Sequence, residues 1–373
     1  MTKETYRIIG VMSGTSLDGI DLVELELNVS INKDIPTSLQ ILDQSQGDVE
    51  GNSWNFHIRA AETVPYSIGW KNDLQEAINY SKDKLEVLNL RYTEKLAEEI
   101  TKFIEKHDIQ DIDAVCSHGH TILHQPDKGI TLQIGNLPHI SKLLGLTVVC
   151  DFRVEDVNLG GQGAPLVPIG DRLLFSAYDY CLNLGGFANC SYEESNKRIA
   201  FDICPANIVL NKYAEKLGKA YDEGGKIAEA GEVNQTLLQQ LNSLSFYSEK
   251  PPKSLGLEWV KENIFPLIDS FNISTEDVLR TFTEHIAVQL KAQFNINASV
   301  LITGGGAYNS FLIKRLKQIS TINVIIPTSE IVEYKEALIF GLLGALKLRG
   351  EVNCLASVTG ALKDHSSGKI YLP

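Results

Sequence analysis

Residues 6–27 read Tyr6-Arg-Ile-Ile-Gly-Val-Met12-Ser-Gly-Thr-Ser-Leu-Asp18-Gly-Ile-Asp-Leu-Val-Glu-Leu-Glu-Leu27. The apolar run that ends at Val11 predicts a buried strand, and residues 20–27 alternate apolar and polar, as in a strand with one buried face. The segment between them contains two glycines and predicts a tight turn. The chain therefore begins with a strand, a glycine turn and a second strand.

The same order of elements returns in the second half of the chain. Residues 179–184 predict a strand, Gly185-Gly-Phe-Ala-Asn-Cys-Ser191 a glycine turn, and Arg198-Ile-Ala-Phe-Asp202 a further strand. The repeat is weak as sequence but suggests two related lobes with a cleft between them. We expect the first lobe at 1–176 and the second at 177–373, with the extreme C-terminus able to return to the first.

Helical patterns alternate with further strands, which places the chain in the α/β class. Apolar residues recur at threes and fours over 73–107, where Ser81 is a candidate cap of a second helix. Other helices are expected over 208–244, 275–294, 311–318 and 336–348. Buried strands are expected at 113–118, 146–151, 298–303 and 322–327.

The composition limits the classes of partner. At roughly 100–200 residues per domain, 373 residues indicate about two domains. Lys and Arg total 34 against 47 Asp and Glu, a net charge of −13, which argues against nucleic acid and anionic membranes as partners. The N-terminus lacks a signal-peptide pattern and no apolar run is long enough to span a membrane, so the expected compartment is the cytoplasm. The sequence leaves the oligomeric state open, a homodimer included.

Cysteine and histidine offer little evidence for a metal site. The six cysteines form no CxxC pair and several lie in apolar runs, so we expect buried thiols without disulfides. His118, His120 and His124 lack a partner cysteine and a common helical spacing, which favours hydrogen-bonding histidines over a zinc site.

Three glycine turns follow predicted strands, at 12–19, 184–191 and 303–309. Such turns let backbone N–H groups approach a phosphate, and a helix that follows adds its positive N-terminal end. A plain hairpin explains any one of them, but three in one chain favour phosphate binding. The Walker pattern is absent and no Gly-x-Gly-x-x-Gly opens a helix after the first strand, which counts against a P-loop enzyme and against a Rossmann dehydrogenase.

Carboxylates stand at the ends of two of these strands. Asp202 ends its strand and is placed to act as a general base, or else to cap a helix. Asp18 borders the first turn and could position Mg²⁺ through water. Asp151 and Arg153, followed by Glu155 and Asp156, fit either a clamp for a polar ligand or a structural salt-bridge cluster.

These segments resemble the anhydro-N-acetylmuramic acid kinase family. The resemblance begins with Met12–Asp21 and continues, in the family's order, nearly to the C-terminus. Its most specific blocks are the first and Gly160-Gly-Gln-Gly-Ala-Pro165; further blocks are Ser117–Thr121, Leu132–Asn136, Val149–Arg153, Asn183–Asn189, Gly304–Asn309, Glu336–Phe340 and Ser357–Ala361.

The resemblance implies a two-lobed actin/hexokinase/Hsp70-like fold with ribonuclease H-like lobes and ATP in the cleft between them. It implies a bacterial enzyme of cell-wall recycling that uses ATP and Mg²⁺, with Asp202 as the base and Asp18 near the metal. The expected nucleotide-binding residues are Met12, Ser13, Gly14, Thr15, Ser16, Leu17, Asp18, Gly19, Gly185, Gly186, Asn189, Gly304, Gly305, Gly306 and Asn309. The expected sugar-binding residues are His118, Asp151, Arg153, Gln162 and Glu336.

In this family a water attacks C1 of the anhydro sugar while the oxygen on C6 accepts the γ-phosphoryl group. The chain departs from the family pattern near the expected site. Cys204-Pro-Ala206-Asn stands where Gly-Pro-Gly-Asn is usual, and Lys253-Ser-Leu-Gly-Leu-Glu258 stands where Lys-Ser-Thr-Gly-Arg-Glu is usual. Asn211, His120 and Gln125 replace Asp, Gln and Glu. These differences leave two alternatives open: a kinase of another anhydro sugar such as levoglucosan, and a sensor that binds sugar or nucleotide without catalysis.

Overall fold

A computed structural model describes residues 3–14, 17–31, 47–49 and 52–373, so that Thr15 and Ser16 lie outside the described residues. The chain forms two compact units. Unit 1 contains Met1–Ala177 and Tyr334–Pro373, and unit 2 contains Tyr178–Glu333. The second lobe was expected at 177–373, with the extreme C-terminus able to return to the first lobe, and the last forty residues belong to unit 1. Helix α13 (Ser329–Arg349) carries the chain from unit 2 into unit 1.

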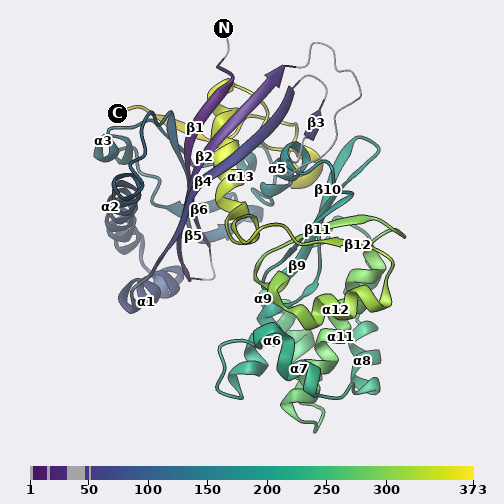
Figure 1. The fold of residues 1–373 in the computed structure, drawn as a ribbon. Coiled ribbons are helices and arrows are strands. Elements are labelled where there is room, and N and C mark those ends of the chain that lie inside the picture. Colours follow the sequence, from purple (N-terminus) through teal and green to yellow (C-terminus); the bar gives the residue numbers. More distant parts are fainter. Residues whose placement is uncertain (1–2, 15–16, 32–46, 50–51) are drawn as a thin grey trace. The chain divides into compact units, whose positions relative to one another are not determined.

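In the described part of unit 1, one sheet contains eight strands (Figure 1). Its central strands are ordered β4-β2-β1-β5-β7; β1, β2 and β4 are antiparallel, and β1, β5 and β7 are parallel. The short strand β3 pairs with β4, β6 with β5, and β13 with β7. The strands are β1 (Thr5–Ser13), β2 (Gly19–Ile31), β3 (Gly47–Val49), β4 (Asn52–Pro65), β5 (Ala114–Gln125), β6 (Ile130–Ile134), β7 (Val148–Cys150) and β13 (Lys369–Tyr371).

The sheet of unit 2 repeats this arrangement. Its order is β10-β9-β8-β11-β12, with β8, β9 and β10 antiparallel and β8, β11 and β12 parallel. When the five main strands of each unit are numbered as they occur in the chain, both sheets have the same spatial order, 3-2-1-4-5. The expectation of two related α/β lobes of the ribonuclease H-like type is confirmed. The strands are β8 (Tyr180–Leu184), β9 (Phe187–Glu194), β10 (Lys197–Pro205), β11 (Ser299–Thr303) and β12 (Asn323–Ile325).

Strand β1 is buried on both faces, because helix α2 covers one face of the sheet and α13 the other (Figure 1). Ile9 and Val11 pack toward α2. Gly10 faces α13, and a Cβ atom there would overlap the carbonyl oxygen of Ala337. The helices of unit 1 are α1 (Ile68–Glu76), α2 (Lys82–Lys106), α3 (Ile140–Leu144), α4 (Val154–Asn158), α5 (Val167–Leu174) and α14 (Ala356–Thr359).

Ser81 caps α2 as expected, since its side chain accepts a hydrogen bond from the N–H of Lys84. In unit 2, α6, α11 and α12 bury their apolar faces against the sheet, with Phe282 and Ile286 of α11 fully buried. The helices of unit 2 are α6 (Asn207–Glu215), α7 (Lys226–Ala230), α8 (Gln235–Asn242), α9 (Leu257–Trp259), α10 (Phe265–Asp269), α11 (Thr275–Gln293) and α12 (Ser310–Ile319).

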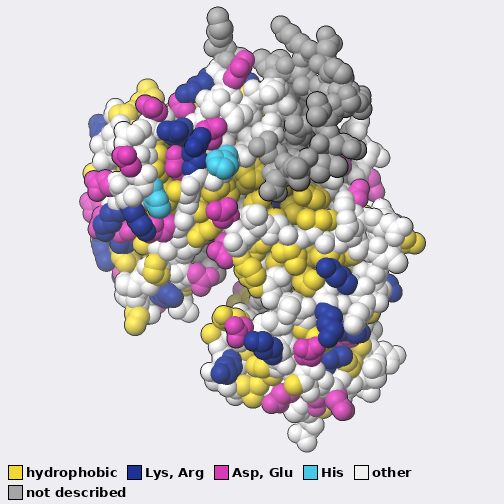
Figure 2. Space-filling view, in the orientation of Figure 1, with side chains coloured by type: hydrophobic (Ala, Val, Ile, Leu, Met, Phe, Trp, Pro, Cys, Tyr) yellow, Lys and Arg dark blue, Asp and Glu magenta, His cyan; other side chains and the backbone are white. Residues whose placement is uncertain are grey.

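The charged side chains, the cysteines and the helices bear on the expectations drawn from composition. Acidic and basic side chains are interspersed over the described part of the face in Figure 2. All six cysteines are buried, as expected, and none of them is disulfide-bonded. Among the described residues, none of the helices combines the length and the apolar character needed to cross a membrane.

Candidate active site

In unit 2, the turn between β8 and β9 is hydrogen-bonded to the start of α6. The carbonyl of Gly186 accepts hydrogen bonds from the N–H groups of Ala206 and Ile208, and that of Gly185 from Asn207. Neither glycine has a positive φ, and a Cβ atom on either would meet nothing closer than 3.4 Å. The fold alone therefore does not require glycine here, whereas a ligand approaching the backbone would. The N-terminus of α6 supplies a positive dipole end beside the turn.

The Gly304–Gly306 turn lies next to the Gly185–Gly186 turn. Strands β8 and β11 are parallel and pair Asn183 with Thr303, so their following turns meet at one edge of the sheet. Gly304 has φ +81°, and a Cβ atom there would crowd the carbonyl of Leu184. Unlike Gly185 and Gly186, Gly304 and Gly306 are required by the packing of the protein itself. Asn309 caps α12 through its Oδ1 atom, so its side chain is already engaged.

Asp202 lies on β10, directly opposite Asn189 of β9 and beside a bulge in the ladder. Its N–H donates to the carbonyl of Lys253 at 3.0 Å, and its Oδ2 accepts from the N–H of Leu255 at 2.7 Å. Burial raises the pKa of Asp202 to about 6, against a smaller opposing effect of the Leu255 hydrogen bond. Among the described residues its Oδ1 has no hydrogen-bond donor. The carboxylate is thus ionised near neutral pH and retains one oxygen that can take a proton.

In unit 1, the turn after β1 is anchored by a buried hydroxyl network. Ser13 Oγ lies 2.9 Å from His120 Nδ1, 2.6 Å from Tyr66 Oη and 2.8 Å from Tyr92 Oη. Burial lowers the pKa of His120 to about 4, so this ring is neutral at physiological pH. The Ser13 side chain therefore points into the interior of unit 1, where it anchors the turn, and is not available to a nucleotide. Met12 is buried too, while Asp18 is exposed at the far end of the turn.

A second polar cluster of unit 1 joins three segments. The Arg153 Nε donates to His118 Nε2 at 2.8 Å, which makes that nitrogen an acceptor, and His118 Nδ1 then donates to the Gly119 carbonyl at 2.8 Å. The Arg153 Nη1 donates to the Gly163 carbonyl at 2.6 Å. Burial, and secondly the charge of Arg153, lower the pKa of His118 well below its usual value. The carboxylate of Glu336 lies within electrostatic range of Arg153.

The remaining expected sugar-binding residues are arranged differently. Asp151 forms an ion pair with Lys369 at 2.6 Å and does not join Arg153. Its φ is +60°, a conformation that costs energy in a residue other than glycine. Gln162 is exposed on the glycine-rich loop, where its N–H donates to the Thr359 carbonyl. His118, His120 and His124 all make hydrogen bonds.

A sequence model described as anhydro-N-acetylmuramic acid kinase matches residues 35–373. The chain belongs to the anhydro-N-acetylmuramic acid kinase family. The family member of Pseudomonas syringae pv. syringae (strain B728a) is 32% identical over 97% of this chain and 98% of its own length. That of Francisella tularensis subsp. novicida (strain U112) is 32% identical over 95% of both chains.

Among solved structures, component A of the Acidaminococcus fermentans (R)-2-hydroxyglutaryl-CoA dehydratase has a TM-score of 0.45 and 12% identity, covering 90% of this chain and 96% of its own.

Two departures from the family pattern follow Asp202 in the chain. Ala206 has φ −131° and ψ −104° and is buried at the start of α6. Cys204 is fully buried, and burial raises the pKa of its thiol, which is therefore protonated. Neither of these two residues faces solvent.

Sequence reasoning missed the groups that support the candidate residues. Tyr66 and Tyr92 hold Ser13, but Tyr92 fits the apolar pattern of α2 and gives no other signal. The backbone N–H of Leu255 reaches Asp202 from a loop fifty residues away, and backbone donors leave no mark in a sequence.

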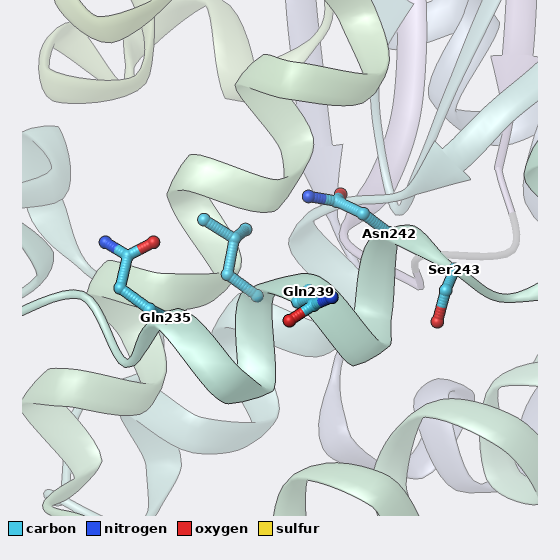
Figure 3. Close-up of a pocket in the computed structure, with 5 residues that line it drawn as sticks. Gln235, Gln239, Asn242 and Ser243 are labelled. Atoms are coloured by element: carbon cyan, nitrogen blue, oxygen red, sulfur yellow. The ribbon is translucent and has the colours of Figure 1, made fainter.

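A shallow depression of about 520 Å³ lies over α8 and is lined by Gln235, Leu238, Gln239, Asn242 and Ser243 (Figure 3). It contains none of the candidate residues and no titratable side chain.

Proposed function

We propose that this chain is an ATP-dependent kinase that acts on 1,6-anhydro-N-acetylmuramic acid in the recycling of the bacterial cell wall, in the cytoplasm. A water attacks C1 and the bond from C1 to the bridging oxygen breaks. That oxygen, still on C6, takes the γ-phosphoryl group of ATP, and ADP leaves. Asp202 accepts the proton of the water, which gives N-acetylmuramate 6-phosphate as product.

Asp202 carries this proposal. A general base must be ionised at working pH and must have a free oxygen near the reacting water. The pKa of about 6 supports the first condition, and an Oδ1 atom that accepts no hydrogen bond among the described residues supports the second. The hydrogen bond from Leu255 to Oδ2 fixes the orientation of the carboxylate.

The glycine turns of unit 2 are the proposed phosphate site. Gly185 and Gly186 leave the backbone open to a ligand, and α6 begins on the same turn. Phosphoryl transfer depends on positioning and on neutralising the charge of the phosphates. Asn189, Gly304–Gly306 and Asn309 would then shape the nucleotide site, with Asn309 acting by capping α12. In unit 1, the turn 12–19 is the second proposed phosphate contact.

Asp18 fits a magnesium ion that accompanies the nucleotide. Its carboxylate is exposed and makes no ion pair or hydrogen bond among the residues that the structure describes. Mg²⁺ prefers carboxylate, phosphate and water oxygens and would supply charge neutralisation on the phosphates. Asp18 would hold it directly or through water.

His118, Arg153 and Glu336 are the proposed sugar-binding residues, together with Asp151 and Gln162. A protonated guanidinium held by His118 and the Gly163 carbonyl is suited to pair with the carboxylate of the sugar's lactyl group. Asp151 would contribute through its backbone, since its side chain is paired with Lys369.

The test is the reaction with the anhydro sugar, ATP and ¹⁸O-water, followed by mass spectrometry. We expect one label at C1 in a product that carries the 6-phosphate. Asp202→Asn should reduce kcat at least about 10²-fold. The matched control is Asp269→Asn, a surface carboxylate of unit 2 paired with Lys216, which should keep full activity. Full activity of Asp202→Asn would contradict the role of the base.

The rival substrate is an anhydro sugar without the lactyl carboxylate. The loop beside Asp202 carries Leu255 and an exposed Leu257 where the family has Thr and Arg, so a hydroxyl and a cation are lost. A panel with levoglucosan separates the two, since higher kcat/KM on levoglucosan would replace the proposed substrate. Stabilisation by sugar or nucleotide without any phosphorylated product would instead indicate a sensor.

A further inference from the structure

Three buried side chains of unit 1 meet where the C-terminal segment packs against α4. Asp156, Cys354 and His365 each direct a ligand atom toward the others, and these atoms lie within 4.8 Å of one another. The cluster is the single such group among the residues that the structure describes. Cys354 and His365 face each other across an antiparallel bridge, which fixes their side chains on one side of the backbone.

Asp156 is fully buried, and Arg153 is within electrostatic range of it without forming an ion pair. Its Oδ1 accepts from the Thr359 hydroxyl at 2.7 Å and lies 3.0 Å from Cys354 Sγ, and its Oδ2 accepts from the Gly163 N–H at 2.7 Å. Among the described residues no Lys or Arg forms an ion pair with it. Buried carboxylates are normally paired with a charge or bound to a metal.

His365 supplies the independent observation. Its side chain is 4% exposed, and its Nε2 has no hydrogen-bond partner among the described residues. This nitrogen lies 3.7 Å from Asp156 Oδ1, too far for a hydrogen bond, while Nδ1 lies 3.1 Å from the Lys363 carbonyl. A histidine whose Nδ1 donates to a carbonyl presents Nε2 as a lone pair, which is the usual arrangement of a metal ligand.

We propose that Asp156, Cys354 and His365 form a binding site for one Zn²⁺ ion. Thiolate, imidazole and carboxylate together are a donor set typical of zinc, and separations below 4.8 Å suit three corners of a tetrahedron. Water would take the fourth corner. Binding releases the proton of the Cys354 thiol, and the two anionic ligands then balance the charge of the ion.

The site would fasten the C-terminal segment to the glycine-rich loop. Asp156 holds the Gly163 N–H, and the Thr359 carbonyl accepts the N–H of Gln162. A Cβ atom on Gly161 would overlap the Asp156 carboxylate, so the loop is built around this group. The inference is independent of the proposed reaction.

The test uses the full chain, stripped with EDTA under reducing conditions and re-equilibrated with Zn²⁺. We expect one equivalent of zinc per chain by elemental mass spectrometry. When Co²⁺ replaces zinc, we expect a thiolate-to-metal charge-transfer band in the near-ultraviolet absorption spectrum. Cys354→Ser should abolish the band, and both Cys354→Ser and His365→Gln should weaken zinc binding. Because loss of an outer-shell partner already costs about 10–100-fold in metal affinity, loss of a ligand should cost at least about 100-fold.

The matched controls are Cys190→Ala, a buried cysteine of unit 2, and His57→Gln, an exposed histidine of β4, which should both bind like the unaltered chain. Less than a tenth of an equivalent of zinc in the unaltered chain would overturn the proposal. So would a cobalt band that persists in Cys354→Ser or disappears in Cys190→Ala. If Cys354→Ser does not fold, the zinc content of the unaltered chain and of His365→Gln still decides.

Discussion

The Asp202 carboxylate combines a partly buried position with a pKa raised to about 6. The base is inactive when protonated, so kcat/KM of the proposed reaction should rise about tenfold per pH unit below about pH 6 and level off above about pH 7. The measurement is a profile of kcat/KM between about pH 4.5 and 8. An acidic limb centred near pH 4, the ordinary value for Asp, would contradict the proposed environment.

The raised pKa of Asp202 also predicts that its ionised carboxylate lowers the free energy of unfolding. The folded-state pKa of Asp202 lies above the ordinary value of 3.8, so the folded protein binds the proton more tightly than the unfolded chain does. The carboxylate therefore destabilises the fold increasingly as pH rises from about 4 to about 6. At about 1.4 kcal/mol per unit, the effect reaches up to about 3 kcal/mol at neutral pH. Asp202→Asn should therefore raise the free energy of unfolding at about pH 7.5 and not at about pH 4. Denaturant unfolding at both pH values tests this; a variant that is less stable at about pH 7.5 would refute it.

Single residues also mark the limit of what the sequence can predict. The sequence placed the glycines in turns, because turns depend on local pattern. It ended the strand at Asp202, whereas β10 continues past a bulge to Pro205. It could not tell that the Ser13 hydroxyl points into a buried network or that Asn309 caps α12. A motif indicates where the backbone turns, but the direction of each side chain depends on residues distant in the sequence.

At the scale of elements, β1 and α13 approach each other as closely as their backbones permit. Gly10→Ala would place a methyl group against the Ala337 carbonyl of α13, and both elements are held by the surrounding core. Overpacking of this kind typically costs about 1–3 kcal/mol of unfolding free energy. The control is Gly69→Ala in α1, where a Cβ atom meets nothing closer than 3.9 Å and should add up to about 1 kcal/mol through helix propensity. Chemical unfolding of both variants tests the contrast, and equal effects would contradict it.

Local patterns predicted most elements, but not all of their pairings. Helix α11 (Thr275–Gln293) matches the expected 275–294, and the first strand–turn–strand unit forms as expected. In the second unit the turn is shorter than expected, because residues 187–191 belong to strand β9, which lies between β8 and β10. Strand β13 has only three residues and pairs with β7 more than two hundred residues away. Such a short strand has no alternation to detect, so its register depends on the assembled sheet.

At the scale of the whole molecule, the net charge of −13 opposes the approach of ATP, which is itself an anion. A protein that attracts ATP through a basic patch would bind it more weakly as salt screens the attraction. Here the proposed contacts are backbone N–H groups, a helix N-terminus and Mg²⁺, while the surface charge is repulsive at long range. We therefore expect the KM for ATP to stay constant or to fall by less than about threefold as KCl rises from about 30 to 200 mM at fixed Mg²⁺. The reason is that salt screens the repulsion between the acidic protein and ATP. A KM that rises about tenfold over this range would instead show that salt screens an attraction, and therefore that lysine or arginine side chains dominate nucleotide binding.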